Sequence, residues 1–177
     1  FEGDQSTSSR QYSPKLSQMI RGGEPPLSAS LYIVATPIGH LDDMSLRAID
    51  VLRSVNLIAA EDTRHSLKLL RHFDVRTPLI SYHDHSETSD LEGMLKRLRA
   101  DETIALISDA GTPLVSDPGY KLVVACHREQ IPVVPIPGPS ATITALSAAG
   151  LPTDHFYFEG FLPPKPGQRV NRLQALT

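Results

Sequence analysis

The sequence predicts an α/β fold, built on a mostly parallel five-stranded sheet with helices on both faces. Two observations predict it. Five short apolar runs of the kind typical of β-strands recur along the chain, and segments of about ten residues with helical apolar spacing separate them. Parallel neighbours need a crossover of about that size, and strands covered on both faces are apolar throughout.

The elements are expected in the following order. LYIVAT at 31–36 is the first strand, and the loop TPIGH follows it. Asp42 or Asp43 is expected to cap the next helix, which runs through 43–55, because a carboxylate accepts bonds from the free N–H groups of a first turn. The later strands are expected at 56–60, 78–82, 103–108 and 131–136. The later helices are expected around 67–73 and 91–98, then at 120–129 and from Ser140 to Gly150.

Three segments are predicted along the chain. Residues 1–30 are rich in Ser, Gln, Pro and Gly and lack the apolar centre of a signal peptide, so they are interpreted as a disordered leader or tag remnant. Residues 31–160 are expected to form the α/β domain, with HFYFEGF at 155–161 as a candidate extra strand. PPKPG indicates a linker, and a helix is expected around Arg169 and Arg172. Residues 161–177 are therefore predicted to be a linker and the start of a truncated second domain.

Composition excludes several classes of protein. Hydrophobic residues make up 40% of the chain, as in globular proteins. Cys126 is the one cysteine, which excludes a disulfide framework and indicates a buried core position. No apolar run approaches about 18 residues, so no membrane contact is expected and a cytoplasmic location is predicted. The net charge of −3 means that nucleic-acid binding needs a local basic patch.

Gly, Pro and polar residues follow the strand ends, which meet on one edge of a parallel sheet, where ligands bind. Gly111 and Gly119 permit a positive φ or a close backbone approach, and neighbouring prolines stiffen the loops. Ser140 begins a helix whose free N–H groups attract a carboxylate. This edge suits a small zwitterionic ligand with a nucleoside part. Taken singly, the glycines and prolines are explained by turns, and Asp117 by a helix cap.

The motifs of common nucleotide sites are absent. The loop after the first strand has one glycine where a Rossmann site needs G-x-G-x-x-G, and no P-loop sequence is present. His83 and His85 lack a firm third ligand, so they are expected to be polar loop residues, and no metal site is predicted.

Five segments nevertheless resemble a known family in order and spacing: TPIGHLDDMSLRAIDVL, IAAEDTRHSLKLL, PLISYHDHSE, ALISDAGTPLVSDPGYKLV and PVVPIPGPSATITALSAAGLPTDHFYFEGFLP. They look like the bacterial small-subunit (16S) ribosomal RNA (cytidine-2'-O-)-methyltransferases, a branch of the tetrapyrrole-methylase superfamily. The resemblance covers about Leu31 to Leu173. It implies two α/β domains with S-adenosylmethionine in the cleft between them. This chain would be the N-terminal domain, which is expected to fold but to show little or no activity alone.

The resemblance also implies roles for individual residues. The cofactor-binding residues would be Asp109, Gly111, Thr112, Pro113, Ser116, Gly138, Ser140 and Ala141. The segments Thr36–Gly39 and Glu61–Arg64 would face the RNA side of the cleft. His40 departs from the pattern, because the family usually has Asn at this position.

The implied reaction moves a methyl group from a sulfonium to a ribose 2'-oxygen, whose proton needs a base within hydrogen-bond reach. The pair Glu61 and Asp62 is the preferred base, and Arg64 would hold a phosphate. Other candidate bases are His83, His85 and Asp109. The alternative for Asp62 is a helix cap, and for Glu61 a brace within its loop.

Two other functions stay open: methylation of a tetrapyrrole (a porphyrin or corrin), and an inactive cofactor-binding or dimerisation module. The expected partners are 16S ribosomal RNA in the small subunit and a second copy in a homodimer. RNA contacts would come from local basic residues, although a charged helix face is also commonly just solvated. These basic residues are Arg64, Lys68, Arg71, His72, Lys165, Arg169 and Arg172.

Overall fold

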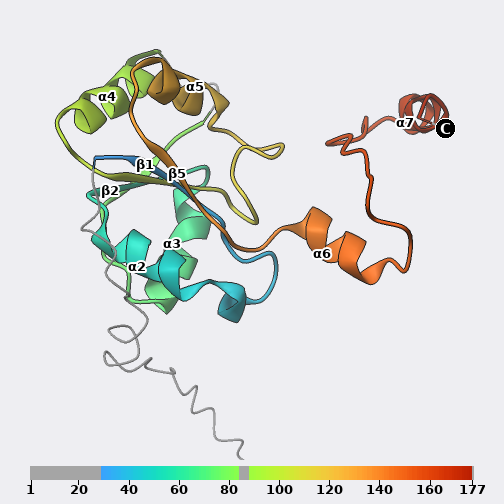
Figure 1. The fold of residues 1–177 in the computed structure, drawn as a ribbon, viewed down its shortest axis with the longest axis horizontal. Helices are drawn as coiled ribbons and strands as arrows, with labels where there is room; N and C mark the ends of the chain where they lie inside the picture. Colours follow the sequence, from blue (N-terminus) through green and yellow to red (C-terminus); the bar gives the residue numbers. More distant parts are fainter. Residues whose placement is uncertain (1–28, 84–87, 177) are drawn as a thin grey trace, which may run out of the picture.

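The computed structural model describes residues 29–83 and 88–176, so most of the expected leader, and His85, lie outside the described residues. Its centre is one parallel sheet in the order β3-β2-β4-β1-β5 (Figure 1). The strands are β1 (Leu31–Val34), β2 (Leu57–Ala60), β3 (Leu79–Ser81), β4 (Ile104–Ile107) and β5 (Val133–Ile136). Val34 is level with Ile107 and with Ile136, so the carboxyl ends share one edge. The predicted fold class is confirmed.

Helices cover both faces of this sheet (Figure 1). They are α2 (Leu46–Ser54) and α3 (Thr63–His72) on one face, and α4 (Thr88–Arg99) and α5 (Tyr120–Arg128) on the other. Successive residues of β4 alternate between the two cores: Ala105 and Ile107 pack with α2, whereas Leu106 packs with α4 and α5. Cys126 is fully buried in the second core, as predicted. Burial of both faces explains why the central strands β1, β2 and β4 are apolar throughout.

The predicted cap of the first helix was wrong. Asp42 and Asp43 lie in a separate short 3-10 helix, η1 (Leu41–Asp43), where Asp42 N–H donates to Nδ1 of His40. The cap of α2 is Ser45, whose Oγ accepts a hydrogen bond from Ala48 N–H at 3.1 Å. Met44, between the two helices in the sequence, is buried, and α2 begins at Leu46, three residues later than predicted.

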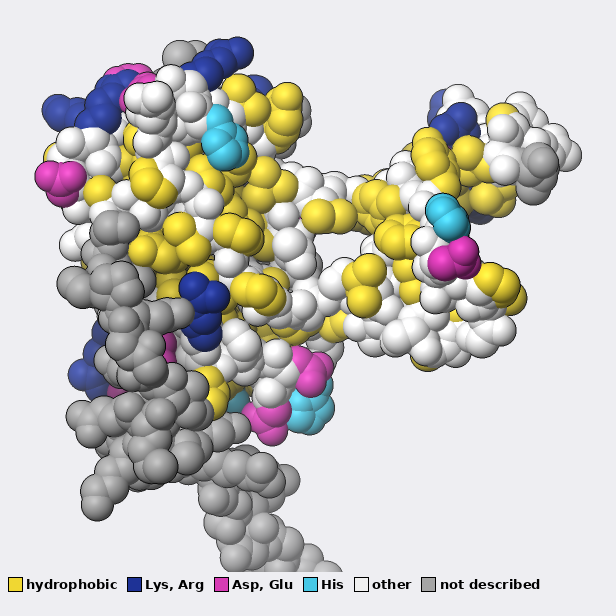
Figure 2. All heavy atoms as spheres, in the orientation of Figure 1, with side chains coloured by type: hydrophobic (Ala, Val, Ile, Leu, Met, Phe, Trp, Pro, Cys, Tyr) yellow, Lys and Arg dark blue, Asp and Glu magenta, His cyan; other side chains and the backbone are white. Residues whose placement is uncertain are grey.

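We call residues 29–140 the body and residues 141–176 the arm. The arm carries α6 (Ala141–Ala148) and α7 (Pro166–Gln174), and neither helix has a buried residue. Figure 1 shows the arm extending away from the sheet, and Figure 2 shows hydrophobic side chains gathered over it. None of the described helices has the length and apolarity needed to cross a membrane.

Two predictions about the arm need correction. The segment 155–161 is not a strand, because a strand needs a neighbouring backbone to pair with, and the described sheet ends at β5. Pro135 lies in that last strand, and a residue without an N–H suits a sheet edge. The PPKPG segment is only partly a linker, because Pro166 opens α7, where its missing N–H costs nothing.

Candidate functional site

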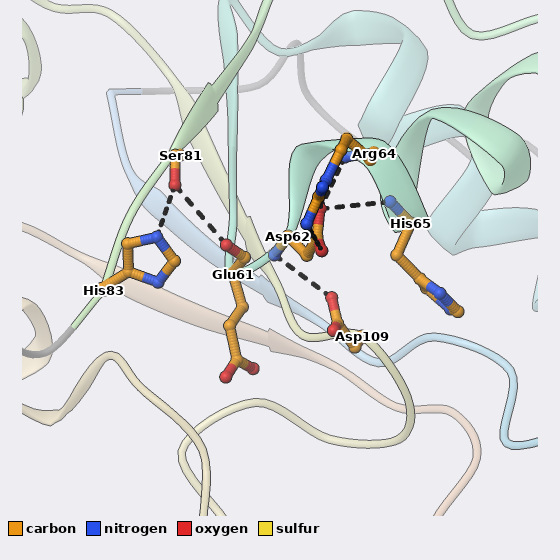
Figure 3. Close-up of polar contacts among 7 residues, drawn as sticks. All are labelled: Glu61, Asp62, Arg64, His65, Ser81, His83 and Asp109. Carbon is orange, nitrogen blue, oxygen red and sulfur yellow. Dashed lines mark hydrogen bonds and ion pairs between the residues drawn. The ribbon is translucent and has the colours of Figure 1, made fainter.

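Polar side chains from three strand ends gather around an open cavity of about 450 Å³ at the carboxyl edge of the sheet (Figure 3). Glu61 and Asp62 follow β2, His83 follows β3, and Asp109 follows β4. Arg64, Thr63 and Ser81 complete the lining. The three predicted catalytic residues are thus brought together.

Asp62 is the N-cap of α3. Its Oδ1 accepts hydrogen bonds from the N–H groups of Arg64 at 2.8 Å and His65 at 3.4 Å. The guanidinium of Arg64 lies 3.1 Å from Oδ2 of the same carboxylate. The side-chain hydrogen bond from Arg64 lowers the pKa of Asp62 to about 2. A carboxylate held this firmly in its charged form is a poor proton acceptor, so the alternative reading of Asp62 as a helix cap is confirmed.

Glu61 has the opposite electrostatic character. Burial raises its pKa, and the charges of Asp109 and Asp117 raise it further, while His83 acts in the other direction. Figure 3 shows its side chain pointing away from the strand ends, beside His83. A carboxyl group whose proton is held more tightly than usual is the better candidate for moving a proton at this edge.

His83 is held by Ser81, the last residue of the strand that precedes it. Its Nε2 lies 2.8 Å from Oγ of Ser81, which in turn donates to the carbonyl oxygen of Glu61 at 3.5 Å. These contacts tie the ends of β3 and β2 together. Within the described ranges, His, Cys, Asp and Glu form no group of three that suits a metal ion.

Asp109 lines the same cavity as Glu61. Its Oδ1 accepts a hydrogen bond from Asp62 N–H at 3.2 Å, so it braces the turn that presents Glu61 (Figure 3). Asp117, expected as a helix cap, does not cap α5, which begins after Gly119 without a side-chain cap. Burial raises the pKa of Asp117, and a hydrogen bond with Ser108 opposes this. Sequence reasoning missed this acid; the repeated Ser-Asp pair at 108–109 and 116–117 was the available signal.

The loops after β1 and β4 pair directly. Thr36 and Gly111 exchange two backbone hydrogen bonds of 2.9 and 3.0 Å. The hydroxyl of Thr36 also donates to the carbonyl of Ser108 at 3.1 Å. Gly111 has a φ of +84°, in the left-handed region that favours glycine. The segments TPIGH and SDAGT are therefore side by side, as the shared edge predicted.

The loop after β5 joins the same edge. The hydroxyl of Thr112 donates to the carbonyl of Pro139 at 3.2 Å. A Cβ added at Gly138 would lie 2.9 Å from Cβ of Ala35, so this loop packs tightly on the end of β1. Oγ of Ser140 accepts a hydrogen bond from Ile143 N–H at 3.5 Å and caps α6, whose first residue is Ala141.

The remaining predicted cofactor residues lie in the loop between β4 and α5. Pro113 is buried, whereas Ser116 is exposed and adopts a φ of +65°. Leu114 is also left-handed, at +71°. A non-glycine residue in this region costs about 1–3 kcal/mol and persists only when its surroundings fix it. A Cβ added at Gly160 would lie 3.4 Å from Oγ of Ser116, so the arm passes against this loop.

Comparisons with known proteins give a consistent result. The family described as Tetrapyrrole (Corrin/Porphyrin) Methylases matches residues 30–176. The chain is 56% identical over 149 residues to Ribosomal RNA small subunit methyltransferase I of Pseudomonas aeruginosa, covering 84% of this chain and 53% of that protein. It is also 56% identical over 147 residues to the Synechocystis protein of the same name, covering 83% and 53%. The chain thus spans about half the length of the curated relatives it matches.

Solved structures show the same fold at lower identity. Uroporphyrin-III-C-methyltransferase from Thermus thermophilus has a TM-score of 0.54 and 24% identity, covering 72% of this chain and 54% of that chain. The cobalamin biosynthetic enzyme cobalt precorrin-4 methyltransferase also has a TM-score of 0.54, with 19% identity, covering 68% and 50%. At this identity the likeness shows the fold alone.

Proposed function

Because the chain belongs to the tetrapyrrole methylase family, we propose that it forms part of an S-adenosylmethionine-dependent methyltransferase that acts on small-subunit ribosomal RNA. The reaction proposed is methylation of a cytidine 2'-oxygen in 16S ribosomal RNA. The observation that carries the proposal is the 56% identity to relatives named as ribosomal RNA small subunit methyltransferases. Methylation of a tetrapyrrole is the second candidate, supported by a fold shared with enzymes of that kind.

The chemistry of the carboxyl edge fits the proposed cofactor. The carboxylates of Asp109 and Asp117 complement positive charge on a sulfonium or an ammonium group. The first-turn N–H groups of α6, after Ser140, complement a carboxylate. We propose that the loops bearing these groups hold the cofactor. The residues proposed to bind it are Asp109, Gly111, Thr112, Pro113, Ser116, Gly138, Ser140 and Ala141.

The cofactor, when bound, supplies an electrophilic methyl group, so the protein chiefly positions the reactants and handles one proton. Glu61 is proposed to accept the proton that the ribose hydroxyl loses when its oxygen takes the methyl group. The sulfur–methyl bond would break in the same step and leave a neutral thioether. Asp62 fixes the first turn of α3 and aims Arg64, whose side chain is 90% exposed, toward a phosphate.

We also propose that the protein forms a homodimer and lies in the cytoplasm. A homodimer is supported by the exposed apolar side chains of the arm, of which Phe161 is 86% exposed. A cytoplasmic location is supported by the ribosomal RNA substrate and by the burial of Cys126 as a free thiol.

The function is tested by radiolabelled methyl transfer to unmethylated 30S subunits, followed by nucleoside analysis. The proteins are the 177-residue chain and a chimera that extends it with the carboxyl-terminal half of the Pseudomonas aeruginosa relative. We expect the chimera to produce 2'-O-methylcytidine. Label in uroporphyrinogen and none in RNA would favour the tetrapyrrole function, and label in neither would refute both.

A further inference from the structure

The outward face of α3 carries an uninterrupted row of cations. Arg64, Lys68 and Arg71 are spaced by four and three residues, which places them on one stripe of a helix. All three are exposed, and the stripe is about 10 Å long at 1.5 Å per residue. We call these three residues the α3 basic stripe. It begins at the lip of the cavity, where Figure 3 shows Arg64 and His65 on the far side of Glu61 from His83.

The described residues compensate the charge of this stripe poorly. Helix α3 contains no acidic residue, whereas the whole chain has a net charge of −3. Asp62 pairs with Arg64, but Lys68 and Arg71 form no ion pair with any described residue. By contrast, Arg99 on the opposite face of the sheet pairs with both Glu92 and Glu129. The unpaired cations are therefore a local feature that an anionic partner would complement.

The neighbouring cavity has the opposite sign. Glu61 and Asp109 line it next to the first turn of α3, and the charge of Asp117, which lies outside the lining, also acts on Glu61. A phosphate is repelled by the cavity and attracted by the helix. A ribose hydroxyl carries no charge and can approach the acidic lining. The phosphate of a nucleotide is therefore attracted to α3, whereas its ribose can enter the cavity.

We propose that the α3 basic stripe binds the phosphate backbone of the RNA strand whose ribose enters the acidic cavity. This inference rests on the proposed function, because it takes RNA as the substrate. The stripe contributes sequence-independent affinity and sets the direction of the strand, while recognition of the nucleotide is left to the cavity. Single-stranded RNA fits best, since its ribose can turn away from its phosphates.

The test compares two charge reversals of equal size in the 177-residue chain. The first variant is Lys68→Glu with Arg71→Glu. The control is Lys96→Glu with Arg128→Glu, two exposed cations near the ends of α4 and α5 on the opposite face. Binding to protein-free 16S ribosomal RNA is measured by filter retention across a range of salt concentrations. Thermal unfolding and S-adenosylmethionine titration of both variants check the fold and the cofactor site.

We expect the stripe variant to lose about tenfold or more in affinity at low salt. Its slope of log affinity against log salt should fall by about 1.4, the value for two phosphate contacts on a single strand. The control should keep the parent slope. Equal losses of affinity in both variants, or no loss in either, would overturn the proposal that the α3 basic stripe binds RNA. A parent chain that binds no RNA would overturn it as well.

The same experiment separates this inference from the proposed function. If the chimera methylates 30S subunits and its stripe variant does so with an unchanged KM, only the stripe is refuted. If the chimera methylates no RNA, the proposed function is refuted, and the proposed role of the α3 basic stripe is refuted with it. A loss of binding to poly-glutamate as large as the loss for RNA would show general anion attraction and also overturn the inference.

Discussion

The body and the arm of this molecule both contain regular helices, but the side chains of these helices are buried to very different extents. Each α-helix of the body contributes residues to one of two cores that sandwich the sheet. Neither α6 nor α7 buries a residue, and Tyr157 and Phe161 are 71% and 86% exposed. The comparison shows that caps and propensity define where a helix runs, whereas only packing gives it tertiary stability.

Apart from the passage of Gly160 against Ser116, the contacts that order the arm lie within it or at its start. Ser140 caps α6, and Arg172 of α7 pairs with Glu159, with Nη2 and Oε2 2.8 Å apart. An ion pair that water can reach contributes little to stability. Helices of eight and nine residues are marginal in water without packing. The arm should therefore tolerate changes that the body does not, and the following experiments test that difference.

The largest difference is expected from matched leucine truncations. Leu106 is 2% exposed in the core between the sheet, α4 and α5, whereas Leu173 in α7 is 46% exposed. Leu106→Ala should lower the free energy of unfolding by about 2–5 kcal/mol through lost burial and a cavity. Leu173→Ala should change it by less than about 0.5 kcal/mol. Urea unfolding followed by circular dichroism measures both, and comparable losses would contradict the distinction.

Two glycines give the next largest contrast. Gly119 has a φ of +126°, and an added Cβ would lie 2.5 Å from Cδ2 of Leu106. Gly119→Ala should therefore cost about 1–3 kcal/mol in strain and overpacking. Gly167 in the first turn of α7 has nothing within 4 Å of an added Cβ. Gly167→Ala should be neutral or raise the helix content of the arm. A stable Gly119→Ala variant would show that the loop is looser than its contacts indicate.

A smaller effect is expected at Glu61, at the carboxyl edge of the body. Its pKa is raised above 4.5 in the folded state, chiefly by burial, so folding disfavours its charged form. The stabilising contribution of the protonated form is complete below pH 4.5 and is lost as the pH rises through the folded-state pKa. Glu61→Gln should therefore raise the free energy of unfolding at neutral pH while lowering methyl transfer by the chimera. A destabilised but active variant would refute the role of Glu61.

The smallest effect concerns Asp62. Its carboxylate should titrate at about 2 rather than 3.8, so its stabilising effect is present above pH 3.8 and lost as the pH falls through about 2. Arg64→Ala should move the midpoint back toward 3.8, because the side-chain hydrogen bond from Arg64 is the largest cause of the shift. Carboxyl ¹³C NMR measures the midpoint directly. An unchanged midpoint in the variant would mean that the backbone N–H groups alone hold the charge.

The sequence predicted the body better than the arm, for a physical reason. The central strands β1, β2 and β4 are apolar runs because they are buried on both faces, and that burial is visible in the sequence. The edge strands β3 and β5 are partly exposed, but they are also short apolar runs. The arm has equally apolar segments, but Phe156 and Phe158 remain exposed, so hydrophobicity alone wrongly indicated a strand. The start of α2 was misplaced because Asp42, Asp43 and Ser45 are all good caps.

The sequence predicted that the candidate site lies at the carboxyl edge of the sheet, but it did not predict the contacts between the residues of the site. Parallel strands bring their carboxyl ends together, so the gathering of Glu61, Asp62 and Asp109 follows from the fold. The hydrogen bond from Asp62 to Asp109 joins residues 47 positions apart, and no local pattern announces it. The same holds for the bond from Thr112 to Pro139, 27 positions apart. Which of these residues bind a cofactor stays a prediction.

The most direct test is an NMR titration of the ¹⁵N-labelled chain with S-adenosylmethionine. If the carboxyl edge of the body holds the methyl donor, the largest shift changes should fall on the loop from Asp109 to Ser116 and on residues 138–141, with little change at α4 or at α7. A chain that remains folded and shows no changes, or changes confined to α7 or the outer faces of the helices, would contradict the proposed site.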